Sequence, residues 1–268
     1  MPGQGRRTST LVDLPPPQAL FTFLVHGGSR MTRTSRPADP PGPEQATKST
    51  RPPETKGGAG DREGWSEVRM ALEELSLFKL EENKTSTMAL LSASNLLLHV
   101  LDEIGPTMLV LRQDIHTNIE RVEEVLMLDP DLNSSLVEIV KKEVAEGTSR
   151  KAGSCSRAIL WLIRSIVFGL TLFQKLDKNP ELKLEQVVEE AYGEVLKPWH
   201  GWISSAAYKI ALKLVPEREA LIRLLMGQEQ DYEALRQDIK SYVLVIQPLL
   251  DETCALLRNH QLDKFKST

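Results

Sequence analysis

The chain has 268 residues, a formal net charge of −4 and a sequence pI near 5.8. This balance argues against nucleic acid as a partner, because nucleic-acid-binding domains carry a strong basic excess on one face. The only cysteines, Cys155 and Cys254, form no CxxC pair and have no cluster of histidines nearby, so we expect neither a disulfide framework nor a metal site, and a reducing compartment.

Residues 1–64 differ in composition from the rest of the chain. Ten of the sixteen prolines precede Glu54, mixed with Arg, Ser, Thr and Gly. Such a segment buries too little apolar surface to offset its ordering entropy, so we expect a disordered extension followed by one domain at residues 65–268. We expect a cytoplasmic protein that contacts membranes transiently, although an extension rich in Arg and Ser is also typical of an organellar transit peptide.

Beyond the extension, apolar residues recur at helical spacing and no alternating strand pattern occurs, which predicts an all-α domain of about eight helices. Turn signals such as Gly105-Pro106, Asp129-Pro130 and Asn179-Pro180 separate the helical blocks. Pro198 is expected in the first turn of a helix, and Pro248 is expected to kink the last one. The expected helices are 65–80, 88–104, 107–128, 132–145, 154–176, 184–196, 199–214, 217–226 and 232–257.

The segment 154–176 has almost no polar face, so it is expected to be the central, buried helix. Arg157, Trp161 and Arg164 follow one stripe of it, where an unpaired guanidinium would carry a large desolvation cost. Two interpretations stay open from the residues alone: a core tryptophan with both arginines at the rim, or a ligand site. No run of about 18 apolar residues is evident, so we expect no membrane-spanning segment.

Two other clusters of polar or aromatic residues stand out. Asp114, Asn118 and Arg121 share one face of the helix 107–128, as either a solvated face or a ligand patch. His200 lies between Trp199 and Trp202, as either a core histidine or a binding group. Walker, dinucleotide-binding, GxSxG and HExxH motifs are all missing from the sequence, so no enzyme is predicted and no cofactor is implied.

These clusters together resemble a known family. In order and spacing, the segments DIHTNIER at 114–121, LWLIR at 160–164 and WHGW at 199–202 resemble the three signatures of the glycolipid transfer protein family, and ALKLVP at 211–216 resembles its plant members. The resemblance covers about residues 85–254. It implies a two-layer sandwich of helices that parts to admit two hydrocarbon chains, and non-enzymatic transfer of one glycosphingolipid, such as glucosylceramide, between membranes.

The resemblance also implies roles for five residues at the headgroup. Asp114 and Asn118 would bond sugar hydroxyls, and Arg121 stands where the family has Lys or Arg. Trp161 would stack on the first sugar, at a position where phosphate-binding members carry an arginine. His200 would donate to the ceramide amide carbonyl while Asp114 accepts from the amide N–H.

Three further features bear on the ligand and the membrane. Trp202 and Ile203 would face the membrane, where exposed aromatic residues anchor a protein without deep insertion. Arg157 stands where ceramide-phosphate-binding members place a phosphate-gripping arginine, so a ceramide phosphate carrier or sensor is the alternative. The last residues of the sequence, 264–268, lack the terminal tyrosine arrangement of animal members. A second alternative is a helical interaction scaffold whose Pro-rich extension docks partners.

Overall fold

The computed structural model describes residues 65–80, 83–227 and 231–267. The chain divides into two units, Met1–Glu54 and Thr55–Thr268, and every described residue lies in the second. Over the described ranges the structure has nine α-helices, two short 3₁₀ helices and no strand, which confirms the all-α class. The extension predicted at residues 1–64 lies outside the described residues.

The helices follow one another with short connections. The α-helices are α2 (Glu67–Leu77), α3 (Thr87–Ile104), α4 (Leu109–Leu128), α5 (Leu136–Ala145), α6 (Cys155–Lys178), α7 (Leu184–Val195), α8 (Trp202–Leu212), α9 (Arg218–Leu225) and α10 (Tyr232–Asn259). The 3₁₀ helices are Pro106–Met108 and Leu132–Ser134.

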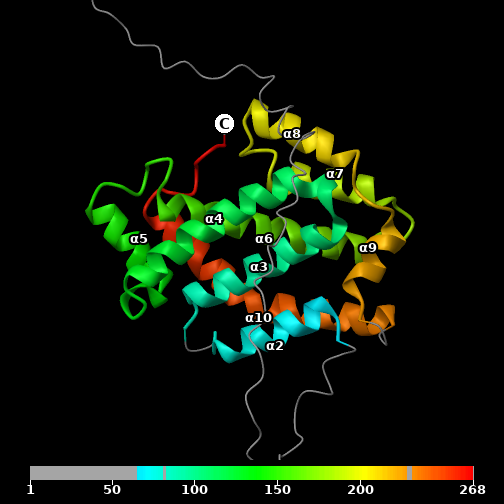
Figure 1. The fold of residues 1–268 in the computed structure, drawn as a ribbon, viewed down its shortest axis with the longest axis horizontal. Coiled ribbons are helices and arrows are strands. Elements are labelled where there is room, and N and C mark those ends of the chain that lie inside the picture. The colour runs from blue at the N-terminus through cyan, green and yellow to red at the C-terminus, as the bar shows by residue number, and fades with distance from the viewer. Residues whose placement is uncertain (1–64, 81–82, 228–230, 268) are drawn as a thin grey trace, which may run out of the picture. The chain divides into compact units, whose positions relative to one another are not determined.

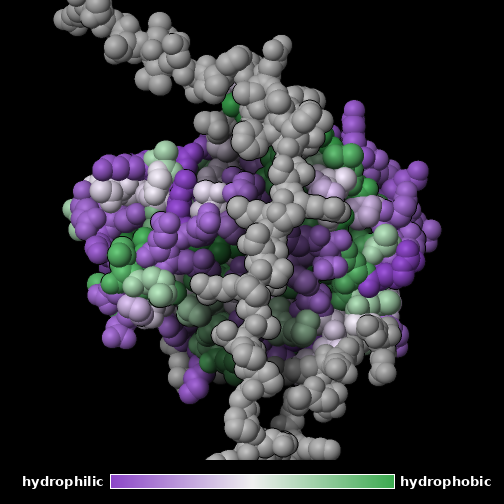
Figure 2. All heavy atoms as spheres, viewed as in Figure 1, coloured by the Kyte–Doolittle hydropathy of each residue, from purple (hydrophilic) through white to green (hydrophobic). Residues whose placement is uncertain are grey.

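The helices pack in two layers, as predicted. Helices α2, α3 and α10 contact one another, α6 contacts α4, α5 and α7, and α6 also packs across the interface onto α3 and α10. Figure 1 shows α2, α3 and α10 in its lower part and α4, α6 and α7 above them. Figure 2 shows hydrophilic side chains over much of the visible face, with hydrophobic residues at separate places between them.

Helix α6 lies at the centre of the core, as its composition predicts. Its start is fixed by the Ser154 side chain, which accepts from the Arg157 N–H at 3.2 Å, and by the Glu143 carboxylate of α5, which accepts from the N–H of Cys155 at 2.7 Å. Of the described helices, α6 alone is long and apolar enough to cross a membrane, which corrects the expectation of no such run. More than half of that apolar window, 56%, is buried within the domain, and a core helix needs this composition.

Two expected helix starts are wrong. Pro198 does not open a helix, because the N–H groups of Trp199 and His200 donate to the Leu196 carbonyl at 2.9 and 3.1 Å and complete a turn after α7. Gly201 is then extended, and α8 begins at Trp202. The helix expected from residue 132 begins at Leu136 instead, because Leu132–Ser134 is a 3₁₀ turn and the next residue is the extended N-cap.

Candidate functional site

An apolar cleft of about 200 Å³ follows one face of α6. Its floor runs along the stripe Trp161, Ser165, Gly169 and Phe173, which lie one turn apart. Side chains of α3, α4 and α8 form the walls. At Gly169 a Cβ atom would lie 3.0 Å from the Leu97 Cδ2 atom of α3, so the missing side chain keeps space between the two helices.

Three of the residues that the sequence singled out line this cleft. Asp114 comes from α4, Trp161 from α6, and His200 from the turn before α8, and all three line the cleft. The ring centroids of Trp161 and His200 are 5.8 Å apart at a tilt of 41°. Asp114, Trp161 and His200 thus add a carboxylate, an indole and an imidazole to the lining of the cleft, and we call the part that they line the mouth.

His200 is held as a neutral ring. Its Nδ1 atom lies 3.2 Å from the Tyr192 hydroxyl oxygen of α7. Burial, and then the nearby Arg164 guanidinium, lower the pKa of His200 below its usual value of 6.5, so the ring is uncharged at pH 7. The Tyr192 hydroxyl also lies 3.4 Å from the Ser205 hydroxyl oxygen. When Tyr192 donates to Nδ1 and accepts from Ser205, the ring proton sits on Nε2, which can donate to a carbonyl oxygen.

The stripe on α4 divides into residues with different surroundings. The Asp114 side chain is exposed at the mouth, but the protein atoms around it raise the pKa of its carboxyl, and the Arg121 guanidinium opposes that shift. Asn118 is buried and donates from Nδ2 to the Asp114 carbonyl at 2.8 Å. Among the described residues, Asn118 and Arg121 do not line the cleft. Asn118 thus bonds to the backbone of Asp114, and Arg121 acts on the Asp114 carboxyl through its charge.

Arg164 is a part of the site that the sequence only partly revealed. Its buried guanidinium lies over the rings of Trp161 and Trp199, 4.7 and 4.2 Å from their centroids. It donates to the carbonyls of Asp263 and Phe265, each at 2.7 Å. Burial lowers the pKa of Arg164 to about 10, so it stays charged at pH 7. In the sequence, the signal for this role of Arg164 is its i, i+3 spacing from Trp161. The carbonyls to which Arg164 donates lie about a hundred residues further along the chain.

The residues after α10 close this side of the mouth, and we call 263–267 the C-terminal segment. The Ser267 N–H donates to the Trp199 carbonyl at 2.9 Å, and the Gly201 N–H donates to the Ser267 hydroxyl at 3.2 Å. Figure 1 shows the end of the chain, in red, approaching α8. The segment therefore holds the turn that carries His200, a role that no local sequence pattern predicts.

Arg157 also bonds to this segment. Its Nη2 atom donates to the Lys266 carbonyl at 2.6 Å, and its guanidinium lies 5.4 Å from the centroid of the Phe265 ring. Of the two arginines on α6, Arg157 is half-buried, whereas Arg164 is buried with two carbonyl partners.

Trp202 and Ile203 point outward at the start of α8. The side chains are 79% and 43% exposed, and Ile210 on the same helix is 57% exposed. Because Trp202 follows the His200 turn directly, Trp202 and Ile203 stand beside the mouth.

Ionisable clusters of the kind that hold metals are not found in the part of the chain that the structure describes. Cys155 is buried, and burial raises the pKa of its thiol to about 12, which leaves it protonated and unreactive.

Comparison with known proteins agrees with this geometry. The family model described as glycolipid transfer protein (GLTP) matches residues 85–227. Glycolipid transfer proteins 3 and 2 of Arabidopsis thaliana are 43% and 41% identical over 215 and 209 residues, which covers 75% of this chain and 92% and 94% of those proteins.

Solved structures share the fold. A GLTP-fold structure that concerns how FAPP2 selects simple glycosphingolipids has a TM-score of 0.63 at 25% identity, covering 68% of this chain and 90% of that one. Mouse ceramide-1-phosphate transfer protein has a TM-score of 0.67 at 17% identity, covering 75% and 99%.

The matches define a helical lipid transfer protein of the GLTP fold. The chain belongs to the glycolipid transfer protein family, and it is similar to the plant members in particular.

Proposed function

We propose that this protein carries one glycosphingolipid with a simple sugar headgroup, such as glucosylceramide, between membranes without chemical change. The observation that carries the proposal is the mouth, where Asp114, Trp161 and His200 open onto one apolar cleft. The similarity to plant glycolipid transfer proteins and to a fold that selects simple glycosphingolipids supports the same ligand class.

The chemistry of the mouth suits a sugar attached to ceramide. An indole face packs on the apolar face of a sugar ring, and a carboxylate accepts from hydroxyl or amide N–H groups. A neutral imidazole with its proton on Nε2 donates to an amide carbonyl. Asp114 and His200 thus match the two polar groups of the ceramide amide, while Trp161 provides the platform for the sugar.

A ceramide phosphate ligand is the alternative, and Arg157 is the residue that favours it. In the structure Arg157 and Arg164 both donate to carbonyl oxygens of the C-terminal segment. A phosphate would have to compete with these carbonyls, and it would find an uncharged Trp161 beside them. This arrangement favours the sugar headgroup.

Lipid transfer between membranes requires a surface that docks on the bilayer, and we propose that Trp202 and Ile203 provide it. Both are exposed beside the mouth, which would bring the headgroup site to the interface where the lipid leaves the bilayer. No covalent step is part of this function, so the protein acts as a carrier rather than an enzyme.

The test measures transfer of fluorescent glucosylceramide and fluorescent ceramide phosphate between vesicles. We expect wild type to transfer the sugar lipid, Trp161→Ala to lose that transfer, and Arg157→Ala to keep it. Trp65→Ala and Arg223→Ala are the matched controls, because Trp65 and the exposed Arg223 lie outside the cleft. Phosphate-lipid transfer that depends on Arg157 would instead establish the alternative.

A further inference from the structure

A second apolar groove lies at the other end of α6 from the mouth. It has a volume of about 400 Å³ and is lined by the last turns of α6, by α9 and by the first half of α10. Its apolar side chains include Ile222, Ile239, Val243 and Leu244, and Leu244 is 76% exposed. We call this space the second groove. The headgroup chemistry described above makes no use of it.

The second groove and the cleft share two residues. Phe173 of α6 and Leu225 of α9 line both spaces. Leu225 is 1% exposed, and Phe173 is partly buried. The two side chains therefore form a partition between two apolar spaces that together run from the mouth to the surface at Leu244.

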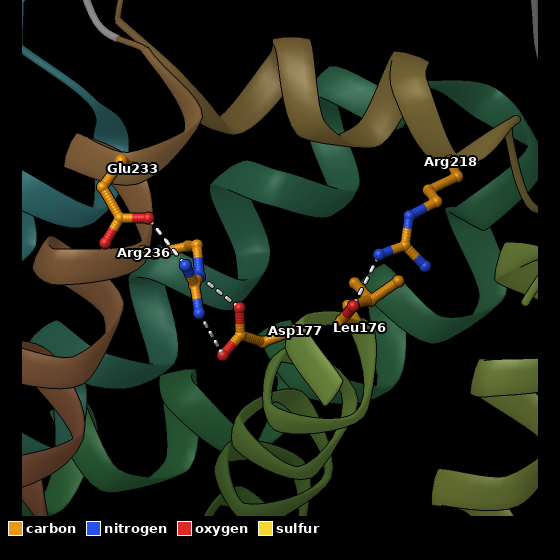
Figure 3. Close-up of polar contacts among 5 residues, drawn as sticks. All are labelled: Leu176, Asp177, Arg218, Glu233 and Arg236. Atoms are coloured by element: carbon orange, nitrogen blue, oxygen red, sulfur yellow. Dashed lines mark hydrogen bonds and ion pairs between the residues drawn. The ribbon is translucent and has the colours of Figure 1, made fainter. Parts of the chain in front are cut away.

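Two arginines hold the walls of the second groove together, as Figure 3 shows. Arg236 of α10 bonds to the Asp177 carboxylate of α6 and, at 2.6 Å, to Glu233. Arg218 of α9 donates to the Leu176 carbonyl at the end of α6 at 2.5 Å. With these walls tied, a rotation of the Phe173 and Leu225 side chains is the simplest way to join the two spaces.

The dimensions suggest what would cross the partition. From Trp161 to Phe173 the helix rises about 18 Å, while ordinary lipid chains fill one leaflet of about 15 Å, half of a bilayer core. A methylene group needs about as much room as one water, about 30 Å³, so the cleft of about 200 Å³ is far smaller than a ceramide. An acyl chain that spans one leaflet can thus end near the partition once the cleft widens. A much longer acyl chain would extend past the partition.

We propose that the second groove binds the distal end of a very long acyl chain and that Phe173 and Leu225 are the gate that the chain displaces. The inference rests on the proposed lipid carrier function. Its occupant is a hydrocarbon chain, because the groove adjoins the cleft across two shared apolar residues and its interior offers few polar groups. The protein would then discriminate between sphingolipids by acyl length as well as by headgroup.

The test compares transfer of palmitoyl glucosylceramide and lignoceroyl glucosylceramide by the full chain. Ile239→Trp fills the second groove without touching the cleft, and Gln237→Trp on the exposed face of α10 is the matched control. We expect Ile239→Trp to reduce the lignoceroyl-to-palmitoyl rate ratio about tenfold, since about two methylene groups or more lose their dry site. Palmitoyl transfer should stay at the wild-type rate, and Gln237→Trp should leave the ratio unchanged.

A second measurement needs no variant. Glucosylceramide with a photoreactive group at the end of its acyl chain is bound to wild-type protein and crosslinked. The lignoceroyl probe should label the α10 peptide that contains Val243 and Leu244, and the palmitoyl probe should not. An unchanged rate ratio in Ile239→Trp, or labelling of the same residues by both probes, would overturn the inference while leaving the carrier function intact. Absence of transfer of either lipid by wild type would instead contradict the carrier function itself.

Discussion

At the residue scale, Asp114 has opposing effects on ligand binding and on the stability of the fold. Its carboxylate stands at the mouth, where it can accept from a ligand, but the surrounding protein raises the pKa of the group and so disfavours its charged form. A carboxyl whose pKa rises on folding adds stability below its unfolded pKa and loses that contribution as pH rises through the folded pKa. At pH 7 the negative charge of Asp114 therefore favours ligand binding and does not stabilise the folded state.

The substitution Asp114→Asn separates these effects. We expect the melting temperature at pH 7 to hold or rise, and that advantage to vanish below about pH 4, where the wild-type carboxyl is protonated. Affinity for glucosylceramide should fall, because an amide cannot replace an anionic acceptor. Thermal melts over pH and lipid titrations measure both. A lower melting temperature with unchanged affinity would show that Asp114 is a structural residue.

Arg164 is the buried cation that joins α6 to the C-terminal segment. Arg164→Ala leaves the Asp263 and Phe265 carbonyls without their donor and opens a space between two indole rings. We expect the free energy of unfolding to fall by about 3 kcal/mol. Denaturant unfolding measures this, with exposed Arg223→Ala as the control. A loss no larger than that of the control would contradict the anchoring role.

At the scale of elements, the space between α3 and α6 decides whether the cleft can open. Gly169→Leu would place a side chain against Leu97, where even a Cβ atom lies 3.0 Å from the Leu97 Cδ2 atom. We expect lipid uptake to fall at least about tenfold while the helical content persists, because the added side chain occupies the lipid's volume. Gly193→Leu on α7, where a Cβ meets nothing within 4 Å, is the control. Equal uptake by the two variants would exclude this path for the lipid.

Helix α8 is the element that would touch the membrane. Trp202→Ala removes a side chain that is 79% exposed, so folding should be unaffected. We expect the transfer rate to fall roughly tenfold through weaker membrane contact. Binding of short-chain lipid in solution should not change. A parallel loss of solution binding would place Trp202 in the ligand site instead.

Helix positions were predictable where periodicity and a stop signal coincide. Helix α3 ends at Ile104, directly before Gly105 with a φ of 102°, as the Gly-Pro pair indicates. The signal misled at Pro198, because a proline also fits the turn that ends α7, and local sequence cannot tell a first turn from a last one. The start of α8 depends on the extended Gly201 and on its bond to Ser267.

At the scale of the whole molecule, the two-layer architecture followed from the family resemblance, and the all-α class followed from the periodicity. The family resemblance predicts Asp114, Trp161 and His200 as headgroup residues, and all three line the cleft. The C-terminal segment was not anticipated, because Arg164 and Arg157 meet its backbone carbonyls, and backbone groups carry no sequence signature. The second groove could not be predicted from the sequence for a similar reason, since it is formed where α6, α9 and α10 converge in the fold.

The stoichiometry of bound lipid tests the central claim most directly. Purified protein is incubated with vesicles containing glucosylceramide, separated from them and weighed by native mass spectrometry, alongside Trp161→Ala and the control Trp65→Ala. The account predicts one glucosylceramide per chain for wild type and the control, and little or none for Trp161→Ala. Wild-type protein that emerges without lipid, or a Trp161→Ala variant that is fully loaded, would contradict it.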